Sequence, residues 1–192
     1  MSEVKQLIQK SIDVKLKLLN EPYLIDAIEK ITAEITNAYR QDRKVLFCGN
    51  GGSAADAQHL AAELSGRFYL DRKPLFAEAL HVNTSYLTAV ANDYSYDEIY
   101  SRLIEASGRN GDVLIGISTS GNSKNVVRAL ETANRAGMIT VGMTGEKGGK
   151  MKELCQYLIN VPSNDTPRIQ ESHILVGHII CELVEKNLFG NL

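Results

Sequence analysis

The pair His59 and Glu63 has the residue types and the spacing of a small catalytic or binding site. The two residues are four positions apart, so on a helix they lie on one face, one turn apart, and both could address the same ligand. A carboxylate and an imidazole are also suited to general acid–base chemistry. The alternative is an ordinary solvated surface pair, which this spacing alone does not exclude.

A glycine-rich turn precedes this pair. The apolar run over residues 45–48 predicts a strand, and the Ala-rich stretch 54–64 predicts a helix. Between them, Gly49, Gly51 and Gly52 permit positive φ angles and the close approach of a ligand to the backbone. Ser53 is placed to cap the helix. The free N–H groups at the start of such a helix can bind an anion or a sugar oxygen.

A second loop, residues 118–123, is rich in hydroxyl groups, which belong to Ser118, Thr119, Ser120 and Ser123. It connects a predicted strand to a predicted helix, so hydroxyls, backbone N–H groups and the positive end of the helix can surround a phosphate. The loop lacks the lysine and the spacing of a GxxxxGK[ST] nucleotide loop, and the first loop fits only a loose dinucleotide fingerprint. A small phosphoester is therefore the predicted ligand. The alternative is a serine-rich turn that only caps its helix.

Other polar residues carry weaker signals. Asn92 and Asp93 open a turn whose side chains suit contacts with hydroxyl groups. Gln170, His173 and His178 lie in the predicted final helix, residues 168–187. His178 has apolar neighbours, a setting in which histidine is more often a core residue than a ligand, and His173 is expected in the core or at the surface.

Alternating strands and helices predict an α/β fold. Two amphipathic helices, over about residues 2–20 and 22–41, precede predicted strands over residues 44–49, 75–80, 112–118, 138–144 and 157–161. The expected architecture is a three-layer sandwich whose mainly parallel, five-stranded sheet is flanked by helices. Ligands of such sheets bind at the carboxyl ends of the strands. Val45-Leu46 recurs as Val113-Leu114, which indicates that both loops open on one edge.

Length and composition restrict the class of protein. With 192 residues the chain can form one good core, so a single domain over residues 1–192 is expected. A net charge of −2 without a Lys/Arg cluster argues against nucleic-acid binding. No apolar run reaches the ~18 residues of a membrane span. Cys48, Cys155 and Cys181 are widely spaced and predict buried thiols in a reducing compartment, so a cytoplasmic protein is expected.

Taken in order, these motifs resemble those of the phosphoheptose isomerases, enzymes of the sugar-isomerase (SIS) fold. The resemblance covers nearly the whole chain and rests on residues 49–53, Asp56, His59, Glu63, Gly66-Arg67, Asn92-Asp93, residues 118–123, residues 168–171 and His178. It implies interconversion of sedoheptulose 7-phosphate and D-glycero-D-manno-heptose 7-phosphate, which supplies heptose for bacterial surface polysaccharides such as lipopolysaccharide. It also implies a homotetramer with active sites at subunit boundaries, in which residues 1–42 serve oligomerisation or packing.

The resemblance implies roles by position. It implies substrate binding by Asn50, Gly51, Gly52, Ser53, Glu63, Arg67, Asn92, Asp93, Ser118, Thr119, Ser120, Ser123 and Gln170. It implies one zinc ion per subunit, with His59, Glu63, Gln170 and His178 as ligands, and acid/base roles for Glu63 and His178. Moving a carbonyl between C2 and C1 requires such proton transfers through an enediolate, whose oxyanion a cation can stabilise.

One of these implications conflicts with helix geometry. Gln170 and His178 are eight residues apart, about 12 Å along an ideal helix, so they cannot easily share one ion from a single regular helix. Either the helix begins after Gln170, or two subunits contribute.

Two other functions compete with the isomerase. A different SIS enzyme would keep the serine loop but not the full set of His59, Glu63, Gln170 and His178. A non-catalytic SIS protein that binds a sugar phosphate as a regulator could dispense with His59, Glu63 and His178, and all three are present.

Overall fold

The computed structural model describes residues 2–190 as seven α-helices, two short 3-10 helices and a five-stranded sheet. The elements in order are α1 Glu3–Leu19, α2 Pro22–Arg40, β1 Val45–Gly49, α3 Gly52–Ser65, β2 Ala77–Ala79, α4 Thr84–Asp93, η1 Tyr96–Glu98, α5 Ile99–Ser107, β3 Val113–Ile117, α6 Lys124–Arg135, β4 Ile139–Gly145, η2 Gly149–Glu153, β5 Tyr157–Val161 and α7 Thr166–Phe189. Every predicted strand is present, although β2 is only three residues long.

All strands of the sheet are parallel, in the order β2-β1-β3-β4-β5. Val45 of β1 pairs with Val113 of β3, and Gly49 pairs with Ile117, so the two strands are in the register that the repeated Val-Leu pair indicates. The loops after Gly49 and Ile117 therefore leave the same edge of the sheet, side by side. This confirms the prediction that both loops share one edge.

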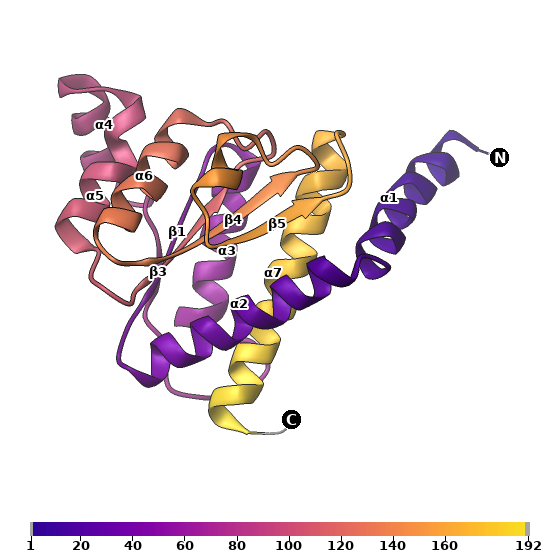
Figure 1. Ribbon diagram of the computed structural model, residues 1–192, viewed down its shortest axis with the longest axis horizontal. Helices are drawn as coiled ribbons and strands as arrows, with labels where there is room; N and C mark the ends of the chain where they lie inside the picture. Colours follow the sequence, from indigo (N-terminus) through magenta and orange to yellow (C-terminus); the bar gives the residue numbers. More distant parts are fainter. Residues whose placement is uncertain (1, 191–192) are drawn as a thin grey trace.

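Helices cover both faces of the sheet, so the sheet and the helices on its two faces form three layers (Figure 1). One core joins α2, α3 and α7 to the face of the sheet that carries Phe47 and Ile115. A second core joins α5 and α6 to the opposite face, which carries Leu46 and Leu114. Successive strand residues alternate between the two cores because side chains of a strand point to opposite faces. The predicted α/β sandwich is confirmed.

Helix α1 differs from the other helices because most of its apolar side chains face solvent. It extends away from the sandwich in Figure 1 and packs through Val14 and Leu18, the two residues it buries. The remaining apolar positions are exposed, namely Val4, Leu7, Ile8, Ile12, Leu16 and Leu19. The helix is amphipathic as predicted, but the described part of this chain does not cover its apolar face.

One local prediction was wrong. Ser53 does not cap α3, because Gly51 occupies the N-cap position with φ +56° and the helix begins at Gly52, which places Ser53 in the first turn. The final helix is present as predicted and begins at Thr166, two residues before Arg168, with Pro167 in its first turn, where proline is tolerated. Across residues 2–190, none of the helices has both the length and the apolar character needed to cross a membrane.

Candidate active site

The side chains of His59, Glu63 and His178 converge on one point between α3 and α7. The distance from His59 Nε2 to Glu63 Oε1 is 2.9 Å, and the distance from His59 Nε2 to His178 Nε2 is 3.2 Å. The two imidazole rings lie 5.0 Å apart between centroids. The i, i+4 spacing on α3 supplies the first contact, and the packing of α7 against α3 supplies the second.

Close packing at a glycine brings the two helices together. A Cβ atom on Gly177 would lie 2.5 Å from the side chain of Leu60 on α3, so a larger residue would force Leu60 to repack or the helices to separate. His178 follows Gly177 directly and therefore reaches His59. The ring of Phe68, in the segment after α3, lies 5.9 Å from the ring of His178 and forms another side of the cluster. The cluster is partly open, with His59 exposed and the other two side chains partly buried.

The donor set of this cluster fits a divalent metal ion. One ligand atom from each of His59, Glu63 and His178 lies within 4.8 Å of the others. Two imidazoles and one carboxylate form a donor set found in catalytic zinc sites, where three protein ligands leave a coordination position open. One turn before His59, Asp56 has a buried carboxylate oxygen without a hydrogen-bond partner among the described residues. Burial raises the pKa of Asp56, and the nearby His59 opposes this shift.

The serine loop forms a compact ring of hydroxyl groups at the carboxyl edge of the sheet. The hydroxyl oxygens of Ser118 and Ser123 lie 2.9 Å apart, and the N–H of Asn122 donates to Ser120 Oγ at 3.2 Å. Gly121, with φ +66°, closes the turn; a Cβ there would meet the backbone of Gly148 at 2.1 Å. Helix α6 starts directly after Ser123, so its free N–H groups point into this region, as an anion site requires.

A cavity of about 290 Å³ adjoins the serine loop. Its lining combines Thr119, Ser120 and Asn122 with residues at the end of β4, in the loop after β5 and at the start of α7, namely Gly145, Glu146, Lys147, Asn164, Thr166 and Ile169. The cavity is polar on the side of the hydroxyls and Lys147. The sequence does not single out Glu146, Lys147, Asn164 or Thr166, because nothing in their local pattern distinguishes them from other polar residues in loops and at helix starts.

A reciprocal amide pair joins the glycine loop to the start of α6. Asn50 donates to Asn125 Oδ1 at 2.9 Å, and Asn125 donates to Asn50 Oδ1 at 2.9 Å. The Tyr96 hydroxyl also donates to Asn50 Oδ1, at 3.1 Å, and the Tyr100 hydroxyl donates to the Gly49 carbonyl oxygen at 2.5 Å. Asn50 is thus held by groups from two other elements. Asn125, which is 2% exposed, was missed by sequence analysis.

The structure separates several residues that the resemblance groups together. Gln170 lies inside α7, where its amide nitrogen would be 2.4 Å from a Cβ on Gly52, so it faces the glycine loop. A helix that begins after Gln170 is therefore excluded. Arg67 is exposed beyond the far end of α3. Asn92 donates to Asp93 at 2.8 Å at the end of α4, and no hydrogen bond among the described residues joins this pair to the His59 cluster.

The His59 cluster and the serine loop also lie apart within one chain. Glu63 is eleven residues after Gly52, which corresponds to about 16 Å along α3. The serine loop lies beside the start of α3, because Gly49 pairs with Ile117. Within one subunit, the carboxylate and the predicted phosphate site are thus at different heights on the sandwich.

His173 occupies the core rather than the site. It is fully buried, and its Nε2 lies 3.0 Å from the carbonyl oxygen of Thr144. In this geometry the neutral imidazole donates its Nε2 proton to the carbonyl. Burial lowers the pKa of His173 to about 4, and the hydrogen bond to Thr144 opposes the shift.

Comparison with known proteins gives a consistent assignment. A family model described as SIS domain matches residues 11–145. The phosphoheptose isomerase of Clostridium acetobutylicum is 52% identical over 187 residues, which are 97% of this chain and 95% of the relative. That of Aneurinibacillus thermoaerophilus is 53% identical over 188 residues, covering 98% and 95% of the two chains.

Solved structures agree. The structure of phosphoheptose isomerase GmhA from Neisseria gonorrhoeae superimposes with a TM-score of 0.89 at 42% identity, covering 95% of this chain and 97% of the other. A phosphoheptose isomerase from Francisella tularensis gives a TM-score of 0.91 at 32% identity, covering 97% and 100%. The chain therefore belongs to the phosphoheptose isomerase family of SIS-domain proteins.

Proposed function

We propose that the protein interconverts D-sedoheptulose 7-phosphate and D-glycero-D-manno-heptose 7-phosphate, with Glu63 and His178 as its acid/base residues. The observation that carries this proposal is the convergence of His59, Glu63 and His178 on one point between α3 and α7. The reaction places the protein at the entry to heptose synthesis for bacterial surface polysaccharides. Its cysteines are free thiols, which is compatible with the proposed cytoplasmic location.

The chemistry needs two proton carriers. Glu63 removes the proton from C1 of the ketose, which produces an enediolate. A proton then passes from O1 to O2, and His178 delivers a proton to C2, which produces the aldose. The reverse reaction uses the same groups in exchanged roles. Each positioned acid or base contributes about 100- to 10,000-fold to the rate. The serine loop holds the phosphate through Ser118, Thr119, Ser120 and Ser123. This anchor determines which carbon atoms of the sugar face the acid/base residues.

Zinc is the metal that we propose for the cluster, since two imidazoles and one carboxylate suit it. When bound, it would supply positive charge for the oxyanion that develops on the sugar. His59 holds Glu63 and His178 at hydrogen-bond distance and so fixes the directions in which they face the substrate. Gln170, about 12 Å from His178 along α7, reaches this cluster only from another subunit.

A homotetramer with active sites at subunit boundaries would bring together the Glu63 carboxylate and the loops that bind the sugar phosphate, which lie far apart within one chain. About 16 Å of helix separate the carboxylate of one chain from its own glycine and serine loops, more than one heptose phosphate spans. A neighbouring subunit can bring its loops and its Gln170 to this carboxylate, and its Arg67 to the sugar. The loop residues concerned are Asn50, Gly51, Gly52, Ser53, Asn92 and Asp93. The exposed apolar face of α1 supports such an assembly.

Incubation of the purified protein with sedoheptulose 7-phosphate, with and without a zinc chelator, tests this function. We expect aldose phosphate as product, loss of turnover on metal removal, and recovery when zinc is restored. The Glu63→Gln variant should fold and bind the sugar phosphate without turnover. Absence of an aldose product from the zinc-loaded protein would contradict the proposed function. Unchanged turnover in the presence of chelator would contradict only the proposed need for a metal ion.

A further inference from the structure

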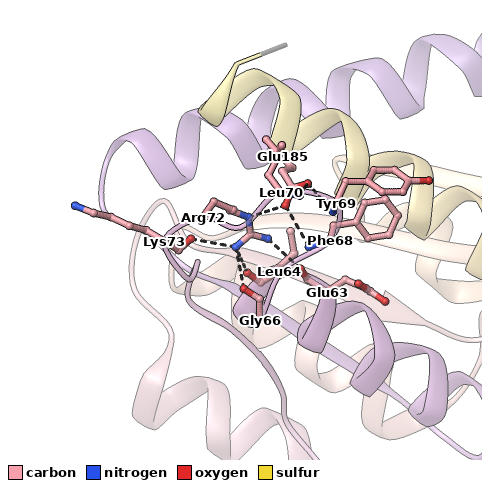
Figure 2. A network of polar contacts seen from close by, with 9 residues as sticks. All are labelled: Glu63, Leu64, Gly66, Phe68, Tyr69, Leu70, Arg72, Lys73 and Glu185. Carbon is pink, nitrogen blue, oxygen red and sulfur yellow. Dashed lines mark hydrogen bonds and ion pairs between the residues drawn. The ribbon is translucent and has the colours of Figure 1, made fainter. Parts of the chain in front are cut away.

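A buried ion pair ties the end of α3 to α7 beside the candidate active site. Arg72 Nε donates to Glu185 Oε2 at 2.8 Å, and the two side chains are 2% and 0% exposed. Arg72 belongs to the segment between α3 and β2, and Glu185 to the last turns of α7. Figure 2 shows Arg72 between the two helices, with its guanidinium at the centre of the network.

The guanidinium binds the backbone that carries the proposed base. Nη2 of Arg72 donates to the carbonyl oxygen of Glu63 at 3.0 Å, and Nη1 donates to that of Leu64 at 2.8 Å. Nη1 also lies 3.4 Å from the carbonyl oxygen of Gly66 and 3.1 Å from that of Lys73. The last carbonyl groups of a helix have no partner inside it, so Arg72 fixes the end of α3.

The carboxylate binds the backbone that carries Phe68. Glu185 accepts from the N–H groups of Phe68 at 3.2 Å, Tyr69 at 2.8 Å and Leu70 at 2.9 Å. The ring of Phe68 lies against His178, which is seven residues before Glu185 and thus on the same face of α7. Burial raises the pKa of Glu185, but the three N–H groups and Arg72 outweigh burial and hold the pKa below its usual value.

We propose that the Arg72–Glu185 pair is a positioning device for the proposed acid/base residues. It fixes the position and orientation of α3 relative to α7, because Arg72 binds the backbone of Glu63 while Glu185 binds the segment that packs on His178. Arg72 and Glu185 are positioning residues, since neither is expected to touch the substrate. This inference rests on the proposed roles of Glu63 and His178.

The chain offers a matched control for a purely structural role. Asp112 is 1% exposed and accepts from the N–H of Lys44 at 3.2 Å, the N–H of Arg109 at 2.8 Å and the ammonium group of Lys44 at 2.5 Å. It precedes β3 and so lies at the edge of the sheet opposite the two loops. Glu185→Gln and Asp112→Asn therefore each remove a carboxylate charge from a buried hydrogen-bond network. The first network lies near the site, and the second lies far from it.

The test compares the zinc-loaded variants by turnover and by imidazole NMR. We expect Glu185→Gln to lower kcat by about tenfold or more, with KM for sedoheptulose 7-phosphate within about twofold of the unsubstituted value. It should shift the ring signals of His59 and His178 and leave those of His173, a buried internal reference. Asp112→Asn should change neither kcat nor these signals, even if it lowers the melting temperature equally. If Glu185→Gln does not fold, Arg72→Lys replaces it, because lysine keeps the charge but not the set of hydrogen bonds to Glu63 and Leu64.

The outcomes separate the two claims. Wild-type kcat in Glu185→Gln, alongside an inactive Glu63→Gln variant, would overturn the positioning role and leave the proposed function intact. An equal loss of kcat in Asp112→Asn would overturn it as well, because stability alone would then explain the effect. If Glu63→Gln retained turnover, the proposed role of Glu63 as the base would fail, and the NMR signals of His59 and His178 would decide whether the ion pair sets their geometry.

Discussion

The Nε2 atoms of His59 and His178 lie 3.2 Å apart, although 119 positions separate these residues in the chain. At this distance the two ring nitrogens can form one hydrogen bond or bind one cation together. Glu63 Oε1 lies 2.9 Å from the same Nε2 atom of His59. The contact between α3 and α7 therefore creates the chemical group that neither helix has alone.

Gly177→Ala should disturb this contact selectively. The added methyl group would lie 2.5 Å from Leu60, so α7 must move away from α3 or Leu60 must repack. Overpacking of this kind costs about 1 to 3 kcal/mol, and His178 should lose its position beside His59. Urea unfolding and turnover measure the two effects. Adding Leu60→Ala makes room for the methyl group and should restore part of the turnover; full turnover in the single variant would show that this close approach is not needed.

Asn125→Ala tests whether the amide pair positions the glycine loop. The substitution removes both hydrogen bonds to Asn50 and leaves a partly buried amide without its partner. We expect kcat/KM for the sugar phosphate to fall by about 5- to 150-fold, which corresponds to a loss of about 1 to 3 kcal/mol in transition-state stabilisation. Asn134→Ala, at the other end of α6, removes hydrogen bonds to Leu154 and Thr140 and serves as control. Equal losses in both variants would count against a role of Asn125 in binding.

His173 should make the stability of the protein depend on pH. Its pKa is lowered to about 4 by burial, whereas in the unfolded chain it is near 6.5. The unfolded state therefore binds more protons between these values, so stability is lost as the pH falls from 6.5 towards 4. The full effect is about 3 kcal/mol. Urea unfolding at several pH values measures it, and His173→Gln should flatten the curve in this window. A curve of unchanged slope in the variant would assign the acid sensitivity to other groups.

The sequence was sufficient to predict most of the fold. Strands such as β3 are short apolar runs bounded by polar turns, and the repeat of Val45-Leu46 as Val113-Leu114 predicts their register. The local cap was predicted wrongly because Gly51 adopts a positive φ angle and so starts α3 before Ser53 can cap it. The exposed face of α1 was not predictable, since a helical pattern does not say what covers it.

The candidate site was predictable only in part, for the same physical reason. His59 and Glu63 meet through helix periodicity, which a sequence displays directly. The approach of His178 depends on how α7 packs at Gly177, and the partners of Asn125, Arg72 and Glu185 are likewise tertiary. Such contacts leave no local pattern. The residues that hold the site in position are therefore visible only in the structure.

Isomerisation in D2O shows whether Glu63 carries a proton between the sugar carbon and solvent. With the zinc-loaded protein, we predict that NMR detects deuterium at C2 of the aldose product, because a proton removed from C1 exchanges with solvent before C2 is protonated. Glu63→Gln should lower the rate of this incorporation by about 1,000-fold while the fold remains intact. Deuterium incorporation at the wild-type rate in that variant would show that Glu63 is not the base.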